Sequence, residues 1–522
     1  MLAALAAAVP VSAADPVVLR RGNRADPESL DPAHIQSVHA NRILNDLFEP
    51  LVTLDAADRP VPAAADHWQV SADGLTYSFH LRPGLRWSDG TRLTAADFVY
   101  AIRRVIDPAN ASHFSALLYP IANASEIARG RLRDLSRLGV EAVDANWLRF
   151  RLVRPTPYWV SLMSQPMFLP LKRAMVEQWG DGFIQPGRLI SNGPFMLRDW
   201  VKGSRLVLVK NPHYRAAAAV RLDQVIFYPI ESESEELKRY RAGDLDVTYF
   251  VPSQQIDLIR QNMGGDWRSE PSLTMDYLGF NMTAPPFADN AKLRQALSMA
   301  IDRQQLVDRV VRTGAPVAYS VAPVALLPDF VDQPADWAWL PMPEKIAKAR
   351  QLYREAGYGD GNPLQVELRT NSSDNVRKMA GAIAAMWQSA LGVHTLLVAE
   401  DYNNFLDHRR KRAGLQIFWY SWTGSYPDAT TFLYLFTTGA TGNDFGYSNM
   451  RYDQLIGAAE QTADPILRIS QLEQAEALLI AESPVAPLFN RQQPYLVKPW
   501  VRGYHIDPCG NSYDREVVIL PH

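Results

Sequence analysis

The residues best suited to binding chemistry lie between positions 418 and 428, where five aromatic residues stand close to three Ser and Thr hydroxyl groups. Large aromatic side chains can bury wide apolar faces against a ligand, and tyrosine and tryptophan keep a polar group at the ring edge. On a β-strand, Phe418 and Tyr420 would share one face and Trp419 and Ser421 the other, so one face belongs to the core and the other is free for a ligand. Pattern alone does not decide which face is which. We expect stacking contacts with a ligand in this segment.

Motifs for bond-breaking chemistry are missing from the chain. It has no Gly-x-Ser-x-Gly elbow, no His-Glu-x-x-His pair, no phosphate loop and no dinucleotide-binding glycine motif. Its closest histidines, His34 and His39, are five residues apart beside Asp31, a spacing that does not place both rings on one helix face. The only cysteine, Cys509, cannot form an intramolecular disulfide and lies in a turn-like sequence, so we expect a structural role for it. We therefore expect no catalytic residue, no metal ligand and no cofactor.

Composition excludes further classes. A chain of 522 residues is long enough for a large core and would normally form two or three domains. Its 53 basic and 56 acidic residues nearly balance, so no net field would concentrate nucleic acid or an anionic membrane. The basic run at residues 409–412 is typical of a solvated helix end. We expect no nucleic-acid partner.

The N-terminus resembles an export signal. Residues 2–11 are apolar and alanine-rich, and the small residues at 11–14 suit cleavage after Ala13 or Ala14. Residues 1–14 are therefore predicted to be a signal peptide, too short to span a membrane. No Lys or Arg precedes Arg20, which leaves open a truncated signal with a start upstream of Met1. No cysteine follows the apolar run, which favours a soluble periplasmic protein over a lipid-anchored one.

Strand and helix patterns alternate along the chain without a repeat, which predicts a mixed α/β fold. Tyr77, Phe79 and Leu81 alternate with polar residues as in a half-buried strand, and Thr94 with Asp97 is a capping box at the start of a helix. Further strands are predicted at 147–153, 205–209 and 415–419, and further helices at 289–314, 344–357, 376–391 and 464–481.

Several motifs in register connect the chain to a known family. They are Leu30-Asp31-Pro32, the stretch 68–107 with its Trp87-Ser88-Asp89-Gly90-Thr91, Ser191-Asn192-Gly193-Pro194-Phe195, Asn211-Pro212-His213-Tyr214, residues 239–246, Glu355-Ala356-Gly357-Tyr358 and Val497-Lys498-Pro499-Trp500-Val501. In this order they resemble the extracytoplasmic solute-binding proteins of the peptide and nickel family (family 5), most closely its periplasmic oligopeptide-binding members. The resemblance covers nearly the whole chain after residue 16.

The resemblance implies a periplasmic-binding-protein-like fold of the class II type, with two lobes around a hinged ligand cleft and a smaller inserted domain. Residues 15–52, 190–276 and 491–522 would form lobe I, residues 53–189 the inserted domain II, and residues 277–490 lobe III. Ligand bound to both lobes would stabilise the closed state, which a membrane permease recognises. The implied function is the capture of oligopeptides for an ATP-driven (ABC) importer, with permease subunits and cytoplasmic ATPases as partners and a monomeric binding protein.

The resemblance also indicates where a ligand would bind, and there the chain departs from its relatives. Ser425 stands where oligopeptide binders have the Asp that pairs with the α-amino group of a peptide. Trp419 replaces an Arg, Val376 a His and Gln36 an acidic residue, while Tyr249 and Phe250 replace two Asn. The full set of expected ligand-binding residues is Gln36, Tyr249, Phe250, Trp419, Ser421, Trp422, Thr423, Gly424, Ser425, Tyr426 and Asp428.

These substitutions leave alternatives open. A hydroxyl cannot compensate the cost of burying an ammonium group, so a neutral cleft would favour N-blocked peptides, cell-wall peptides or a less polar solute. Asp428 is an alternative anchor for the amine, and a shifted alignment is another explanation. A periplasmic peptide hydrolase would be distinguished by turnover of its ligand, and a holdase chaperone by a large exposed apolar surface.

Overall fold

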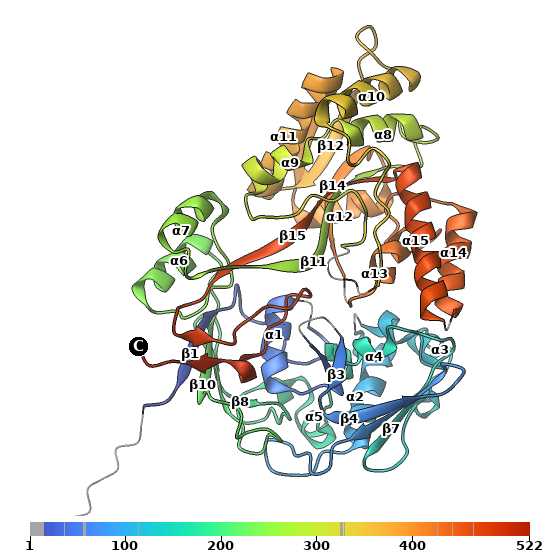
Figure 1. Ribbon diagram of the computed structural model, residues 1–522. Coiled ribbons are helices and arrows are strands. Elements are labelled where there is room, and N and C mark those ends of the chain that lie inside the picture. The colour runs from blue at the N-terminus through green and yellow to red at the C-terminus, as the bar shows by residue number, and fades with distance from the viewer. Residues whose placement is uncertain are drawn as a thin grey trace, which may run out of the picture.

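The computed structural model describes residues 15–35, 37–55, 59–112, 114–323, 327, 329–424, 426–440, 442–462 and 464–522. The predicted signal peptide, Gln36 and Ser425 lie outside these residues. Among the described helices, none is long and apolar enough to cross a membrane. The chain forms an upper and a lower body connected by two long strands (Figure 1).

Lobe I, in the lower body, is the part built on the sheet with strand order β1-β10-β9-β8. Its strands are β1 (Val18–Gly22), β8 (Phe195–Val201), β9 (Arg205–Lys210) and β10 (Gln224–Tyr228), and only the β1–β10 pair is parallel. Helix α1 (Val38–Leu47) contacts β8, while α6 (Glu233–Ala242) and α7 (Ile256–Asn262) lie to one side. The C-terminal strands β16 (Val501–Arg502) and β17 (Val518–Ile519) complete this part. Lobe I therefore combines segments from the beginning, the middle and the end of the chain.

Domain II, also in the lower body, is the part built on the antiparallel sheet β4-β5-β7-β6. Tyr77, Phe79 and Leu81 are buried, as the alternating pattern predicts. The Asp97 carboxylate accepts the Thr94 backbone N–H at 2.8 Å, which confirms the capping box. The elements are β2 (Val52–Leu54), β3 (Pro60–Pro62), β4 (Ala65–Val70), β5 (Thr76–Leu81), β6 (Val140–Ala142), β7 (Trp147–Arg151), α2 (Ala95–Ile106), α3 (Ala124–Ala128), α4 (Trp159–Leu162) and α5 (Arg173–Trp179).

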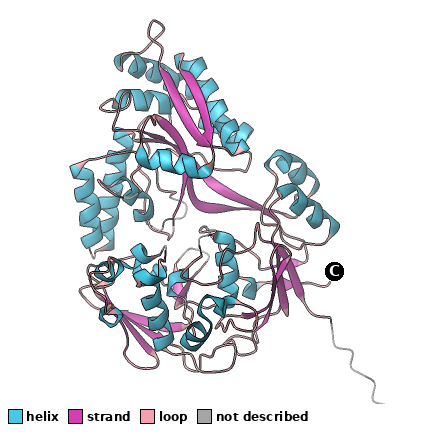
Figure 2. Cartoon of the chain, turned by 180° about the vertical axis from the view of Figure 1, so that it is seen from behind, coloured by secondary structure: helices cyan, strands magenta, loops and turns pink. Residues whose placement is uncertain are grey.

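Lobe III, the upper body, is built on the five-stranded sheet β13-β12-β14-β11-β15 with helices on both faces (Figures 1 and 2). Because side chains alternate along a strand, Leu278 and Phe280 of β11 join one core and Met275 and Tyr277 the other. The strands are β11 (Trp267–Phe280), β12 (Gln365–Asn371), β13 (His394–Glu400), β14 (Ile417–Thr423) and β15 (Val485–Leu496). The helices are α8 (Ala291–Met299), α9 (Arg303–Leu306), α10 (Met342–Glu355), α11 (Asp374–Leu391), α12 (Tyr402–Lys411), α13 (Thr430–Leu433), α14 (Met450–Gln461) and α15 (Pro465–Glu482).

Strands β11 and β15 are the long connections between the upper and lower bodies (Figure 1). They pair antiparallel from Gly279↔Val485 to Trp267↔Leu496, with a register shift between Pro271 and Met275. Leu273, in the shifted part, donates its backbone N–H to Pro508 of lobe I. The irregularity thus lies where the chain passes from one body to the other, as a hinge requires. Both strands cross the boundaries predicted at residues 276 and 490, and the remaining domain limits stay a prediction.

The single helix predicted for residues 289–314 is wrong. Helix α8 ends at Met299, and Asp302 accepts the Gln305 backbone N–H to begin a second helix, α9, followed by a π-helical turn at Val307–Val311. The apolar spacing persists across this break because both helices pack on the same core. The predicted strand at 415–419 is observed as β14, shifted to Ile417–Thr423.

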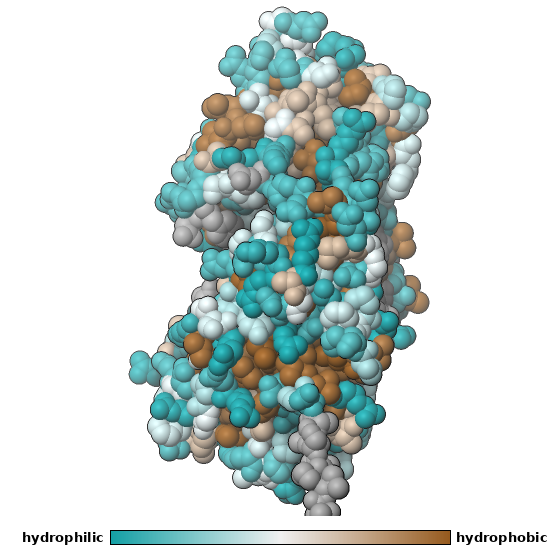
Figure 3. Space-filling model, turned by 90° about the vertical axis from the view of Figure 1, so that its left-hand side faces the viewer, coloured by the Kyte–Doolittle hydropathy of each residue, from teal (hydrophilic) through white to brown (hydrophobic). Residues whose placement is uncertain are grey.

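The side of the molecule with α6 and α7 is mostly hydrophilic, with apolar side chains gathered on its lower part (Figure 3). The outline narrows between the upper and lower bodies in this view.

Candidate functional site

A cavity of about 560 Å³ lies where lobe I, domain II and lobe III meet. Its lining combines segments that are far apart in the sequence, so it exists only in the folded chain. Lobe I contributes Ile35, Ser37, Val38, Asn41, Cys509 and Asn511, domain II contributes Phe114, Leu117, Gln165 and Pro166, and lobe III contributes Thr423 and Gly424.

The lining is neutral: none of these described residues is an Asp, Glu, Lys or Arg. Amide and hydroxyl groups supply its polarity. The Asn41 side chain donates to Asn511 Oδ1 at 2.6 Å, and Asn41 Oδ1 has no hydrogen-bond partner among the described residues. The cavity can therefore offer hydrogen bonds and apolar contact to a ligand, but no compensating charge.

Strand β14 brings an unpaired edge to this cavity. It pairs with β12 only through Ile417 and Phe418, whereas its pairing with β11 continues to Thr423. Gly424 donates its N–H to Leu273 on the β11 side, so the backbone groups of Trp419, Ser421 and Thr423 point to the opposite side. Among the described residues no strand covers that part of the edge. An extended ligand could add there as a further strand.

Gly424 permits a close approach at the end of this edge. A Cβ at this position would lie 2.7 Å from Leu273 Cδ2 and 2.8 Å from Thr431 Cγ2. Only glycine fits without displacing these atoms. Next to it, the Thr423 hydroxyl hydrogen-bonds the Thr274 hydroxyl at 2.9 Å.

Ser421 belongs to a charged group at the hinge strands. Its hydroxyl donates to the buried carboxylate of Asp276 at 2.5 Å and accepts from Arg491 Nη2 at 2.8 Å. Arg491 also forms an ion pair with Asp276 at 2.8 Å. Since Asp276 is on β11 and Arg491 on β15, the group connects three adjacent strands at the lower edge of lobe III.

Trp419 does not face the cavity, contrary to what the resemblance favours. Trp419 is 1% exposed. Its ring packs in the core of lobe III near Phe489 and donates Nε1–H to Asp276 Oδ1 at 3.3 Å. Helices cover both faces of this strand, so neither face is left for a ligand at position 419. Trp422 is held similarly, because its Nε1 donates to the Thr431 carbonyl at 2.8 Å.

Tyr426 and Asp428 are also held by protein contacts. Tyr426 stacks on Tyr158 of domain II with centroids 4.5 Å apart, and burial raises its pKa well above the ordinary value. Asp428 pairs with Arg468 through two hydrogen bonds of 2.8 and 2.9 Å. Burial lowers the pKa of Arg468, but the adjacent Asp428 carboxylate outweighs this effect and raises it. Asp428 thus already has its counter-ion, which disfavours it as the anchor for a ligand amine.

Tyr249 and Phe250 lie in lobe I, edge to face with centroids 4.7 Å apart. Their backbone N–H groups donate to Glu236 at 2.7 and 3.0 Å, and the Arg42 guanidinium lies 4.3 Å from the Tyr249 ring centroid. Burial raises the pKa of Glu236 to about 7 despite these hydrogen bonds. The structure does not place either ring among the lining of the three-part cavity.

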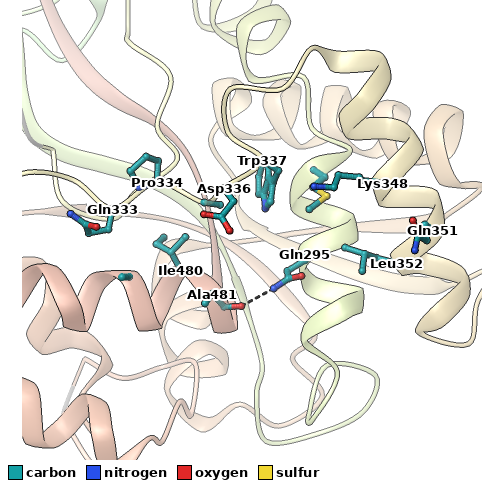
Figure 4. Close-up of a pocket in the computed structure, with 13 residues that line it drawn as sticks. Gln295, Gln333, Pro334, Asp336, Trp337, Lys348, Gln351, Leu352, Ile480 and Ala481 are labelled. Carbon is teal, nitrogen blue, oxygen red and sulfur yellow. Dashed lines mark hydrogen bonds between the residues drawn. The ribbon is translucent and has the colours of Figure 1, made fainter.

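A second cavity, of about 470 Å³, lies wholly within lobe III (Figure 4). Trp337, Asp336 and Lys348 line it, and Gln295 donates to the Ala481 carbonyl across its floor at 2.7 Å. A ligand there would contact one lobe only and could not distinguish an open from a closed arrangement. The three-part cavity is therefore the better candidate for a binding site coupled to closure.

Of the predicted residues, Thr423 and Gly424 line the cavity and Ser421 shares its free edge. Most of the lining residues from lobe I and domain II could not be predicted from the sequence. Asn41, Phe114, Gln165 and Asn511 carry no local signature, because an isolated amide or aromatic residue on a loop or helix is common everywhere. Cys509, for which the sequence predicts a structural role, lies on the wall of this cavity within its turn-like segment.

The fold and this site define a class: a two-lobed binding protein with a hinge of two long strands and a ligand cavity between the lobes. Comparison with known proteins gives the family. The model for bacterial extracellular solute-binding proteins, family 5, matches residues 59–444, and this chain belongs to that family.

Individual relatives extend over the whole chain. The probable deoxycholate-binding periplasmic protein YgiS of Escherichia coli K12 is 34% identical over 533 residues, covering 100% of this chain and 98% of the relative. The periplasmic oligopeptide-binding protein OppA of the same organism is 34% identical over 531 residues, covering 99% and 96%. The unliganded open form of the periplasmic murein tripeptide-binding protein MppA superimposes with a TM-score of 0.86, at 35% identity and 98% coverage of each chain.

Proposed function

We propose that this protein is the periplasmic substrate-binding component of an ATP-driven importer, which captures oligopeptides between its lobes and delivers them to a membrane permease. Its relatives OppA and MppA are named for oligopeptide and murein peptide binding. The permease subunits, with their cytoplasmic ATPases, would be its protein partners, and the chain would act as a monomer. It would bind its ligand and release it unchanged, as a binding protein rather than an enzyme.

The observation that carries this proposal is the free edge of β14 beside the three-part cavity. Backbone groups of Ser421 and Thr423, which are not buried, could pair with peptide amides, which gives affinity that does not depend on the side chains of the peptide. Contacts of the same peptide with Asn41 or Asn511 of lobe I would add to the stability of the closed state. A peptide therefore fits both the edge and the coupling to closure.

The neutral lining of the three-part cavity favours peptides whose N-terminus carries no charge. The test is thermal unfolding of the ligand-free protein with tri- to pentapeptides, each with a free and an N-acetylated amino terminus. Ligand at about a hundred times its dissociation constant stabilises by roughly 2.7 kcal/mol, which is easily detected. We expect acetylated peptides to stabilise at least as well as free ones. Stabilisation by the free-amine peptides alone would contradict the neutral cleft.

A matched variant sharpens this test. Ser425→Asp places a carboxylate at the sequence position where oligopeptide binders carry one. The variant should gain affinity for free-amine peptides relative to acetylated ones, because an ammonium leaving water needs a counter-charge. Mass spectrometry of the recovered peptide completes the experiment: intact peptide supports a binder, and cleaved peptide would indicate a hydrolase.

A second candidate ligand is a less polar, amphipathic solute. The absence of charged residues from the described lining and the name of the relative YgiS favour it. Deoxycholate below its micelle concentration serves as the probe in the same unfolding assay. Stabilisation by deoxycholate and by no peptide would overturn the peptide proposal while leaving the binding-protein class intact.

A further inference from the structure

A compact group of two imidazoles and one carboxylate lies on domain II, apart from the cavity between the lobes. Asp66 and His67 are on β4 and His80 is on the adjacent strand β5. One possible ligand atom from each lies within 4.8 Å of those from the other two. Two imidazoles and one carboxylate are a donor set that zinc and its neighbours in the first transition series accept.

Strand pairing explains how the three side chains meet. His67 pairs with His80 across the antiparallel β4–β5 ladder, and the register shifts between Ala65 and His67. At such a bulge two residues of one strand oppose one residue of the other, which turns the extra side chain toward its neighbours. Asp66 is this extra residue, so it joins both histidines.

The geometry within the group is tight. Asp66 Oδ1 lies 2.6 Å from His67 Nδ1 and 2.8 Å from His80 Nδ1, so one carboxylate oxygen contacts both rings. Ligand atoms on a tetrahedral zinc ion with bonds of about 2.0–2.1 Å are about 3.3 Å apart. A small opening of the group would admit an ion in place of the bridging protons.

The surroundings hold the rings without blocking them. Trp147 of β7 packs against both imidazoles, with centroids 4.9 Å from His80 and 5.4 Å from His67. The side chains of His67, Asp66 and His80 are 52%, 29% and 24% exposed, so an ion can reach them from solvent.

We propose that Asp66, His67 and His80 form a surface site for a divalent transition-metal ion such as Zn²⁺. Three protein ligands leave one tetrahedral position for water. The ion would link β4 to β5 on the solvent face of the domain II sheet and stabilise that domain. The site is independent of the peptide cavity and of the proposed transport function.

The test uses the full-length protein without a polyhistidine tag, stripped with a chelator and titrated with ZnCl₂ by isothermal calorimetry. We expect one equivalent of Zn²⁺ to bind and His80→Ala to weaken binding at least tenfold. Asp66→Asn, which preserves the shape of the side chain, should weaken it less. His213→Ala, at an exposed histidine elsewhere, is the matched control and should leave binding unchanged.

Either of two calorimetric results would overturn the proposal: no saturable Zn²⁺ binding by the wild-type protein, or equal binding in the His67→Ala/His80→Ala double variant. Circular dichroism and the urea midpoint in chelator establish that each variant folds. X-ray absorption at the zinc edge of the wild-type complex gives a readout that needs no variant. Two imidazole ligands are expected, and a shell of oxygen atoms alone would refute the site.

Discussion

The ion pair between Asp428 and Arg468 gives a quantitative test of how the segment after β14 is held. Asp428 follows the free edge of that strand, and Arg468 is on α15. Their side chains are 14% and 7% exposed, and two hydrogen bonds join them. Arg468→Met keeps much of the side-chain volume and removes the charge, so it leaves the carboxylate without its counter-ion.

The expected cost follows from this burial. Removing one partner of a buried ion pair costs about 3–5 kcal/mol, mostly because the other charge stays buried and unpaired. Asp428 retains hydrogen bonds from the Thr430 backbone N–H at 3.0 Å and hydroxyl at 2.6 Å, and it is partly open to solvent. We therefore expect a cost at or just below the lower limit of that range, about 2–3 kcal/mol. At roughly 2–4 °C for each kcal/mol in a domain of this size, the melting temperature should fall by about 4–12 °C.

The assay is urea and thermal unfolding of the wild type, Arg468→Met, Asp428→Asn and the double variant. The double variant should recover part of the loss, since it no longer buries an unpaired charge. Arg173→Met, which removes an exposed ion pair with Glu177, is the matched control and should leave the midpoint unchanged. A shift for Arg468→Met no larger than the control, or no recovery in the double variant, would refute the reasoning.

Three further predictions follow from buried contacts. Gly22→Ala should destabilise lobe I by more than about 2 kcal/mol in urea unfolding, because the new Cβ would lie 1.5 Å from Glu236 Oε1. An unchanged unfolding midpoint would contradict this prediction. Burial raises the pKa of Glu476 from 4.5 to about 7 although three backbone N–H groups donate to it. The folded state therefore keeps a proton on Glu476 that the unfolded state loses as the pH rises. The free energy of unfolding of the wild type should fall by about 3 kcal/mol between pH 4.5 and 7, relative to that of Glu476→Gln. Parallel pH profiles of the two proteins would refute this prediction. Tyr158→Ala removes the ring stacked on Tyr426 across domain II and lobe III, and it should widen the mean separation of the two bodies measured by small-angle scattering, whereas an identical curve would show that the stack does not hold them.

Local elements could be predicted because their causes are local. The capping box of α2 depends on Thr94 and on Asp97 three residues later, and the burial of Phe79 follows from alternation within one strand. The family could be assigned because its motifs are spread in order along the chain. The break between α8 and α9 could not be predicted from the sequence. The apolar spacing continues past Asp302, although the helical backbone of α8 ends at Met299 and α9 begins at Arg303.

The lining of the cavity can be predicted only in part. The aligned segment predicts Thr423 and Gly424, which line the cavity, but no pattern predicts Asn41 and Asn511, because an amide shows no role until the fold brings a second wall opposite it. The burial of Trp419 could not be predicted for a related reason. Alternation along β14 indicates that the strand has two faces, but only the helices packed on both sides of the sheet show that each face is buried at position 419.

The fold class, the family, and the strands and helices whose signals lie within about ten residues can be read from the amino-acid sequence. Tertiary structure alone decided which groups meet: the pairing of Asp428 with Arg468 forty residues away, the neutral lining drawn from three parts of the chain, and the group of Asp66, His67 and His80 created by a bulge. The physical reason is range. Capping, alternation and turn formation depend on neighbours in the chain, whereas counter-ions, cavities and ligand sets depend on side chains that are adjacent only after the sheets and lobes have packed.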